Sequence, residues 1–512
     1  MSRAIVIGAG HNGLVAGLLL ARAGRTVTVV ERLSVVGGLC AASEVHPGYT
    51  VPGVLHDTTG VRREIVDALG LSRFGLSFES EAPSVLAAHS EHKGVVLHAE
   101  AKRSRDELEA LHAGDGEGYI EWRGFLSRVR SFVSGVLNQK PPVMKPDSIA
   151  EFWNLGKTGI GLRRLGKPDM LELMRVAPMC AADWLQEYFG DPLPSAALAA
   201  PAAIGASLGP WSGGSAASLM LYECARGAEV KGGPAALTKA LREAFEAAGG
   251  EIALASQVTH IRVEGGAVSG VELEGGRFVE APLVVASCDP KHALLDLVEP
   301  GVLPLDVEEQ VASVRARGTT AKLNLALDGQ MSFRDREGER HARAVVADHL
   351  DDIERAFDAA KYRGCSERPH LEVSIPSVND ASLAPPGKDV VSILAHAAPY
   401  DLEGGWTNEA SENFGDAAVA VLESVAPGTR AMIVAREVLS PADLENRYGL
   451  TGGHIHHGEH ALDQLLFMRP TPKLARYKTP IEGLYLGGSG SHPSGGVTCQ
   501  PGALAAEAIL KG

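Results

Sequence analysis

The chain has 512 residues, of which 45% are hydrophobic and 22% charged, and its formal net charge is −15 at pH 7. This length exceeds one ordinary hydrophobic core, so we expect two closely connected domains. The acidic balance argues against nucleic acid as a partner, because binding to phosphates needs clustered Lys and Arg.

The six cysteines are scattered singly along the chain. None has the CxxC spacing of a redox centre or a zinc knuckle. Free thiols in a large chain fit a reducing compartment, so we expect a cytoplasmic protein. The sequence also contains no run of about 18 apolar residues that would span a bilayer. Peripheral contact with a membrane stays open.

The N-terminal residues have the pattern of a βαβ dinucleotide-binding unit. Residues 4–7 (AIVI) are wholly apolar, as in a buried parallel strand, and residues 26–30 (TVTVV) predict a second strand. Between them, residues 8–13 (GAGHNG) have the GxGxxG spacing and open a helix that runs to about Ala23. Glu31 follows the second strand directly.

Each glycine of this motif has a mechanical role. Gly8 permits the tight turn, Gly10 lets a pyrophosphate approach the backbone, and Gly13 lets helix and strand pack closely. The positive end of the helix dipole faces the phosphates. Glu31 is placed to accept hydrogen bonds from the adenosine ribose.

Two further stretches favour FAD over NAD. Gly37 and Gly38 follow the ribose acid, where two-domain flavoprotein oxidases and reductases line the pyrophosphate. Later, residues 484–486 predict a strand that leads through a glycine-rich bend to a helix from about Pro501. A helix N-terminus under the flavin pyrimidine would stabilise negative charge on the reduced ring. A strand and helix that only complete the sheet are the alternative.

Residues 233–287 predict another layer, made of an amphipathic helix, three strands in hairpins and one buried strand. The expected fold is therefore α/β, with a discontinuous Rossmann-type FAD-binding domain and an α+β substrate-binding domain. The FAD-binding domain is expected at 1–70, 225–300 and 475–512, and the substrate-binding domain at 71–224 and 301–474.

The motifs resemble those of the phytoene desaturase-like flavoproteins, the FAD-dependent carotenoid and retinoid oxidoreductases. Within them, the branch labelled pyridine nucleotide-disulphide oxidoreductase domain-containing is the most similar. The resemblance is carried by residues 5–17, 380–400, 452–472 and 483–502. It implies a dehydrogenase, desaturase or oxidase that takes hydride from a hydrophobic substrate, of which a polyprenoid or carotenoid is one candidate, onto flavin N5.

The resemblance also implies where FAD binds, with the adenine near Val258. The residues expected to hold FAD are Gly8, Gly10, Asn12, Gly13, Glu31, Arg32, Gly37, Gly38, Leu39, Val258, Gly488, Ser489, Gly496 and Val497. Related flavoproteins place a loop over the isoalloxazine where this chain has His56 and Asp57. These two residues, His457 and His492 are the catalytic candidates, and a structural hydrogen-bonded histidine is the alternative for each imidazole.

The chain departs from the family at two points. Leu39 and Cys40 stand where phytoene desaturases and amine oxidases usually continue the GG pair with Arg. The sequence also lacks a redox cysteine pair and a second GxGxxG, so the expected electron acceptor is dioxygen, a quinone or another acceptor rather than a bound pyridine nucleotide. Two other functions stay open, a flavin amine oxidase and a non-enzymatic protein that binds FAD and an apolar ligand.

Two other motifs suggest chemistry that we do not expect. Residues 205–209 (GASLG) match GxSxG, but Pro201 and Pro210 replace the strand and helix that a nucleophilic Ser207 needs. Residues 453–460 (GHIHHGEH) look like a metal site, but their glycines break the helix that would align the imidazoles. We predict no metal there and interpret the segment as a wall of the flavin active site.

Overall fold

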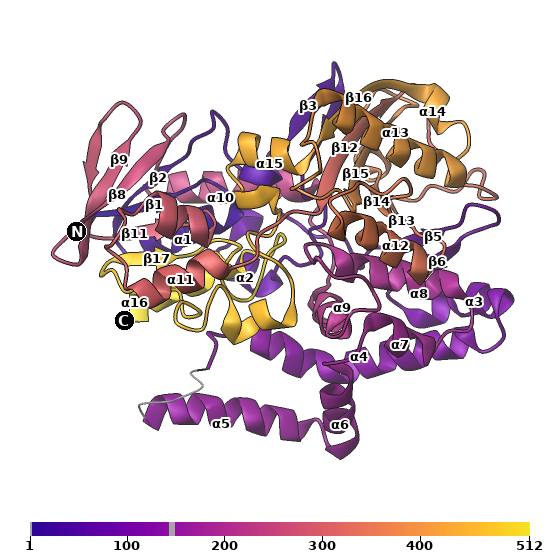
Figure 1. The fold of residues 1–512 in the computed structure, drawn as a ribbon, viewed down its shortest axis with the longest axis horizontal. Helices are drawn as coiled ribbons and strands as arrows, with labels where there is room; N and C mark the ends of the chain where they lie inside the picture. The colour runs from indigo at the N-terminus through magenta and orange to yellow at the C-terminus, as the bar shows by residue number, and fades with distance from the viewer. Residues whose placement is uncertain (1–2, 143–148, 512) are drawn as a thin grey trace.

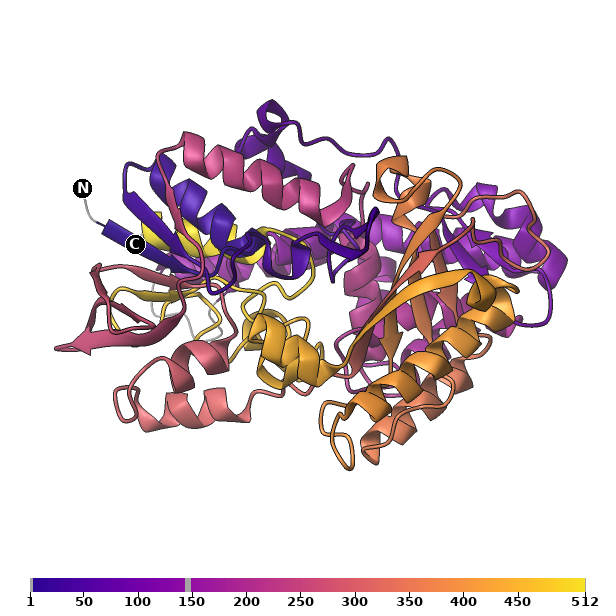
Figure 2. The same ribbon diagram turned by 90° about the horizontal axis from the view of Figure 1, so that it is seen from above.

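The structure is a computed structural model that describes residues 3–142 and 149–511. Two sheets of different character lie at opposite ends of the molecule (Figures 1 and 2). Within the described ranges, no helix combines the length and the apolar character that crossing a membrane requires.

A parallel five-stranded sheet has the strand order β17-β11-β1-β2-β7. Its strands are β1 (Arg3–Ile7), β2 (Thr26–Val30), β7 (Glu251–Ala253), β11 (Val284–Ala286) and β17 (Leu484–Leu486). They come from three separate parts of the chain, as the sequence predicts, and the α/β class is confirmed. The residue boundaries of the two domains stay a prediction.

Alternation along β1 decides what covers each face of this sheet. Ala4 and Val6 pack against three helices, and Ile5 and Ile7 pack against a three-stranded antiparallel sheet (Figure 2). The helices are α1 (His11–Arg22), α10 (Gly233–Ala247) and α16 (Gln500–Lys511). The covering strands are β8 (Val258–Glu264), β9 (Ala267–Leu273) and β10 (Phe278–Glu280).

A seven-stranded sheet forms the other end of the molecule, with the order β16-β12-β15-β14-β13-β5-β6. Its strands are β5 (Val85–Ala88), β6 (Val95–Leu97), β12 (Thr320–Leu327), β13 (Arg343–Val346), β14 (Leu371–Ser374), β15 (Asp389–His396) and β16 (Ile433–Leu439). Leu323, Val373 and Ile393 on one face pack against α13 (Asn408–Val425).

The opposite face of the seven-stranded sheet is buried but polar. Because side chains alternate along a strand, the polar residues at every second position of β12, β13, β14 and β15 share this face. Cross-strand pairing aligns Lys322 with Leu394 and Glu372, and Asn324 with Ser392. The polar residues on this face are Thr320, Lys322, Asn324, Arg343, Glu372, Ser374, Ser392 and His396.

A layer of helices lies beside this polar face and shares one hydrophobic core. These helices are α4 (Asp115–Leu137), α6 (Lys167–Val176), α7 (Ala181–Gln186), α8 (Pro192–Ala199), α9 (Ser215–Ala225) and α12 (Leu350–Lys361). Around the two ends lie α2 (Arg63–Ala68), α3 (Arg105–Leu111), α5 (Ile149–Arg164), α11 (Leu305–Ser313), α14 (Thr429–Met432), α15 (Pro441–Tyr448), β3 (Ser43–His46) and β4 (Tyr49–Val51).

Candidate active site

A cleft, called here the dinucleotide cleft, opens at the carboxyl ends of β1, β2 and β11, where ligands bind in open parallel sheets. Ten residues predicted to hold FAD line it, namely Gly8, Gly10, Asn12, Glu31, Arg32, Gly37, Gly38, Leu39, Val258 and Ser489. Gly496 and Val497 instead line a second cavity next to this cleft, which is described below. Gly13 and Gly488 contact the backbone around the cleft.

Two glycines of the GxGxxG motif have different surroundings. A Cβ on Gly13 would lie 2.0 Å from the carbonyl oxygen of Gly8, so only glycine lets α1 pack this close to β1. A Cβ on Gly10 would approach the carbonyl of Gly37 no closer than 4.0 Å, so its backbone faces the open cleft. The N-terminus of α1 is therefore accessible to an anion such as a pyrophosphate.

The Glu31 carboxylate is held in place at the edge of the cleft. Its Oε2 accepts a hydrogen bond of 2.7 Å from the Ala9 amide, and its Oε1 accepts one of 2.8 Å from the Leu33 amide. The side chain is buried but lines the cleft. This geometry fixes a carboxylate in the position that a ribose-binding acid takes after the second strand.

The two glycine-rich stretches meet at the cleft, although 477 residues separate them. The Asn12 amide donates a hydrogen bond of 3.2 Å to Ser489 Oγ, and the Gly502 amide of α16 lies 3.5 Å from Asn12 Oδ1. A Cβ on Gly488 would lie 2.3 Å from the Ser287 carbonyl. The bend after β17 therefore packs directly on the segments after β1 and β11.

A second cavity, called here the apolar cavity, adjoins the dinucleotide cleft, and Leu55 lines both. Its volume is about 160 Å³. Its walls come from α9, β15, the segment 55–62 and the loop 493–498. Its apolar lining consists of Leu55, Leu137, Pro201, Ala202, Ile204, Leu221, Ala225, Leu394, Leu465, Pro493 and Val497.

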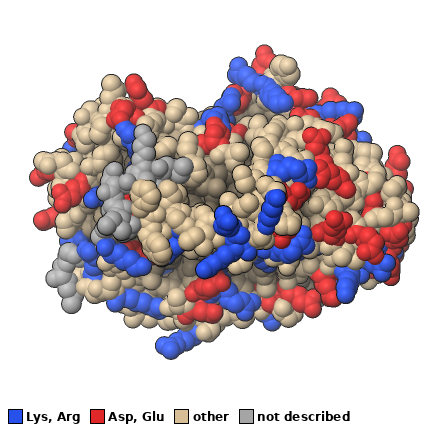
Figure 3. All heavy atoms as spheres, turned by 90° about the horizontal axis from the view of Figure 1, so that it is seen from below, with Lys and Arg blue, Asp and Glu red and all other residues tan. Residues whose placement is uncertain are grey.

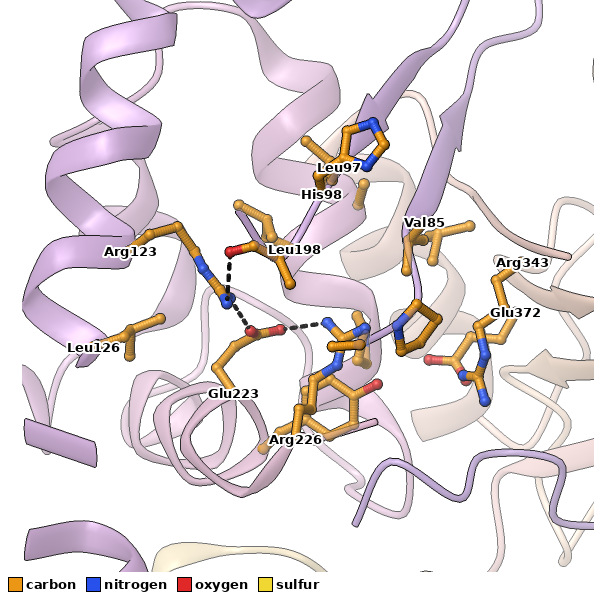
Figure 4. A pocket seen from close by; sticks show the side chains of 18 of the residues that line it. Val85, Leu97, His98, Arg123, Leu126, Leu198, Glu223, Arg226, Arg343 and Glu372 are labelled. Carbon is orange, nitrogen blue, oxygen red and sulfur yellow. Dashed lines mark hydrogen bonds and ion pairs between the residues drawn. The ribbon is translucent and has the colours of Figure 1, made fainter. Parts of the chain in front are cut away.

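A third cavity, called here the arginine cavity, adjoins the apolar cavity and has a volume of about 350 Å³. Both cavities are lined by His56, Pro201, Tyr222, Arg226 and Glu372. Figure 4 shows the arginine cavity between α4, α9 and the strands β5, β13 and β14. Four guanidinium groups line it, those of Arg123, Arg130, Arg226 and Arg343.

Asp57, a predicted catalytic residue, lines the apolar cavity as an anchored anion. Its carboxylate accepts hydrogen bonds from the Tyr222 hydroxyl at 3.0 Å and from the Arg343 guanidinium at 3.3 Å. Burial alone would raise the pKa of Asp57, but the charges of Arg343 and Arg226 hold it well below its usual value. Asp57 therefore positions its neighbours and is a poor proton acceptor near neutral pH.

His56 lies at the junction of the apolar and arginine cavities, against the polar face of the seven-stranded sheet. Its Nδ1 lies 3.2 Å from Ser392 Oγ and 3.3 Å from Lys322 Nζ. Burial lowers the pKa of His56 well below its usual value, and the charge of Lys322 lowers it further. Burial also lowers the pKa of Lys322, to about 7. The imidazole is therefore neutral near pH 7.

The segment 453–460 borders both the cleft and the apolar cavity. His457 lines the dinucleotide cleft, and His456 and His460 line the apolar cavity, where their rings stack with centroids 4.3 Å apart. The Glu459 carboxylate forms an ion pair with Arg315 and accepts a hydrogen bond from the amide of Ser207. Within the described part of the chain, no group of three or more His, Cys, Asp or Glu has a metal-binding arrangement.

The other singled-out residues lie away from these cavities or serve packing. His492 is buried and is absent from the described linings of all three cavities, so its catalytic role stays a prediction. Ser207 lies in the connection between α8 and α9 and not at a strand-to-helix turn. The six cysteines are all unpaired in the structure.

Sequence reasoning missed much of the arginine cavity. In α9, Leu219 and Cys224 are core residues, but Tyr222 and Glu223 line the arginine cavity. The polar face of β12, β14 and β15 was missed as well. Polar residues at every second position of otherwise apolar strands are the signal that could have revealed it.

Comparison with known proteins agrees with this geometry. Residues 6–63 match the family described as NAD(P)-binding Rossmann-like domain. Over 99% of its length the chain is 30% identical to pyridine nucleotide-disulfide oxidoreductase domain-containing protein 2 of Rattus norvegicus, covering 93% of that protein. It is 23% identical to a 4,4'-diapophytoene desaturase of a Methylomonas species, covering 96% of this chain and 92% of the desaturase.

Solved structures share the fold over the whole chain. Putrescine oxidase aligns with a TM-score of 0.58 at 14% identity, over 100% of this chain and 99% of the oxidase. The fold, the cleft and these relatives define an oxidoreductase with a Rossmann-type dinucleotide domain. The chain belongs to the family of pyridine nucleotide-disulfide oxidoreductase domain-containing protein 2. The predicted resemblance to this branch and to the phytoene desaturases is thereby confirmed.

Proposed function

We propose that this enzyme is an FAD-dependent dehydrogenase, desaturase or oxidase that takes hydride from a largely hydrophobic substrate. The observation that supports the proposal most directly is that a glycine-lined dinucleotide cleft adjoins an apolar cavity. In a two-domain flavoenzyme, the first would hold the cofactor and the second the reacting part of the substrate.

The residues around the cleft fit FAD. The open backbone at Gly10 and the N-terminus of α1 would hold the pyrophosphate. The anchored Glu31 carboxylate would accept hydrogen bonds from the ribose, and the backbone at Val258 would contact the adenine. When bound, the isoalloxazine ring supplies a hydride acceptor. Leu39, which replaces the usual arginine, also lines the cleft and supplies no charge there.

The residues around the apolar cavity have separate roles in the proposed reaction. The apolar cavity excludes water and orients the substrate carbon chain. The contacts of His56 described above use Nδ1, and burial keeps the imidazole neutral, so His56 would position the substrate through Nε2 rather than take a proton from it. Asp57 holds Tyr222 and Arg343 in place beside it. We further propose dioxygen or a quinone as the electron acceptor.

The absorbance of purified protein tests this proposal. We expect flavin absorbance after incubation with FAD, and anaerobic bleaching by at least one member of a panel of polyenes, fatty acyl compounds and amines. Protein that takes up no FAD would overturn the proposal. Bleaching by amines alone would favour a flavin amine oxidase, and the absence of bleaching would favour a binding role. Reoxidation by dioxygen or by a soluble quinone identifies the acceptor.

Contact with a membrane surface is part of the same proposal, because a hydrophobic substrate would be stored there. α5 exposes Phe152 and Trp153, and its last turn carries Arg163 and Arg164. Figure 3 shows the face that carries α5, where Lys and Arg side chains gather. Apolar side chains beside basic ones suit an anionic interface. We expect sedimentation with phosphatidylserine vesicles, reduced in Trp153→Ala. Equal recovery with and without vesicles would contradict it.

A further inference from the structure

The arginine cavity has a charge that hydrocarbon binding does not require. The guanidinium of Arg123 donates to Glu223 at 2.6 Å, and that of Arg226 donates to the other oxygen of Glu223 at 3.0 Å. Arg343 pairs with Glu229 and with Asp57. Figure 4 shows the row Arg123–Glu223–Arg226 on one side and Arg343 with Glu372 on the other.

The positive and negative groups do not cancel. The four guanidinium groups face three ion-paired carboxylates, those of Asp57, Glu223 and Glu229. The fourth carboxyl group, Glu372, is different, because burial and the charge of Asp57 raise its pKa to about 8. Glu372 is then mainly neutral at pH 7. Among the described residues that line the cavity or pair with its arginines, four positive charges therefore face three negative ones.

Two buried atoms are left without hydrogen-bond partners. Among the residues that the structure describes, neither Arg226 Nε nor Glu372 Oε1 has one. Leaving such buried groups unpaired is unfavourable, so an occupant that satisfies them is favoured. Both residues line the arginine cavity and the apolar cavity, and they therefore mark the junction between the two.

We propose that this junction binds the carboxylate of an amphiphilic substrate whose apolar chain lies in the apolar cavity. One carboxylate oxygen accepts a hydrogen bond from Arg226 Nε–H, and the other accepts one from the protonated Glu372. A single negative charge balances the cavity. An ammonium group would be repelled by Arg226, and a neutral alcohol or hydrocarbon would leave the excess positive charge of the cavity unbalanced. The inference rests on the proposed function, because it names the substrate class of the same site.

Calorimetric titration of the FAD-loaded protein at pH 7 tests the proposal without turnover. The ligands are dodecanoate, dodecan-1-ol, methyl dodecanoate and dodecylamine, which share one chain and differ in the head group. We expect dodecanoate to bind at least ten-fold more tightly than the alcohol or the ester, equivalent to about 1.4 kcal/mol. Equal affinities, or tighter binding of the amine, would overturn the proposal.

Substitutions of Arg226 test whether this residue causes the preference for dodecanoate. Arg226→Gln should reduce the ratio of dodecanoate to dodecanol affinity to about one, and Arg226→Lys should keep part of it. Arg242→Gln is the matched control, because Arg242 also pairs with a glutamate but lies exposed on α10. An unchanged ratio in Arg226→Gln, with its melting temperature preserved, would refute the assignment. If Arg226→Gln does not fold, the Arg226→Lys ratio decides.

These outcomes are distinct from failure of the proposed function. Protein that binds dodecanoate preferentially but whose flavin no substrate bleaches would keep the subsite and lose the oxidoreductase mechanism. Protein that is bleached by hydrocarbons and binds all four ligands equally would keep the mechanism and lose the subsite.

Discussion

The two sheets bury their strands in different ways. In the five-stranded sheet both faces are apolar, with Val6 against helices and Ile5 against the three-stranded sheet. In the seven-stranded sheet Leu323 packs against α13, whereas its neighbour Lys322 lies on the polar face beside His56, and both are 0% exposed. Full burial of a strand therefore does not require two apolar faces when one face borders an internal cavity. Backbone shape therefore defines the dinucleotide cleft, and charged side chains line the arginine cavity.

The largest effect is expected where the first sheet depends on backbone shape. Gly13→Ala would place a Cβ 2.0 Å from the Gly8 carbonyl, so α1 must move away from β1. We expect a loss of about 3 kcal/mol or more in unfolding free energy, together with loss of FAD binding. Urea denaturation and flavin content measure both.

A glycine of α5 provides the control for this substitution. A Cβ on Gly159 would meet no described atom within 4 Å, so Gly159→Ala should change stability by about 1 kcal/mol or less. Equal stability of the Gly13 and Gly159 variants would contradict the idea that helix and strand are in fixed contact.

The second effect concerns charge on the polar face. Burial lowers the pKa of Lys322 from its usual value to about 7. Between pH 7 and about pH 10, Lys322 is therefore protonated in the unfolded chain but mainly neutral in the folded protein. Protein stability should therefore rise with pH over this window. Lys322→Met removes the cost of burying an ionisable amine. We expect this variant to be about 2 kcal/mol more stable than the wild type at pH 7, after allowing for lost hydrogen bonds.

This difference should shrink as the pH rises from 7 to 9, by up to about 1.4 kcal/mol per pH unit. Thermal or urea denaturation at both pH values measures it. Lys239→Met, at an exposed position of α10, is the control and should show no such gain. A constant difference at both pH values would mean that Lys322 stays charged in the folded protein.

The smallest effect concerns Glu372, whose pKa burial raises to about 8. The charged groups that act on it are Asp57, Arg343, Arg226 and Lys322. Above pH 8 its carboxylate would repel a bound carboxylate, so dodecanoate affinity should fall about five-fold between pH 7 and 9. Glu372→Gln keeps a neutral donor and should bind with little pH dependence. A parallel fall in the variant would assign the titration to another group.

Much of the dinucleotide cleft could be predicted because its sequence signals are local. The glycine spacing after β1 and the acid after β2 lie within 31 residues of sequence, and both line the dinucleotide cleft. The strand at 484–486 and the helix from Gln500 were located correctly for the same reason. Short motifs indicate local geometry without knowledge of the distant parts of the chain.

The apolar and arginine cavities could not be predicted in the same way, because many of the residues that interact there are distant in sequence. His56 and Lys322 are 266 residues apart, and Arg343 reaches Asp57 across 286 residues. Arg226 and Glu223 are only three residues apart, but no short motif marks them. The pairing of β12, β15, β14 and β13 brings Lys322 and Arg343 onto one face of the sheet.

The hydrogen bond between Asn12 and Ser489 has a consequence for biosynthesis. At a translation rate of about 5–20 residues per second, the ribosome needs about 25–95 s to add the 477 residues that separate the two. Once β11 has been synthesised, it lacks its neighbour β17 until residues 484–486 follow, and this edge of the sheet is open to solvent or to chaperones. The dinucleotide cleft is therefore complete only after Ser489 has been synthesised, and prematurely terminated chains would be targets for proteolysis rather than partially active enzymes.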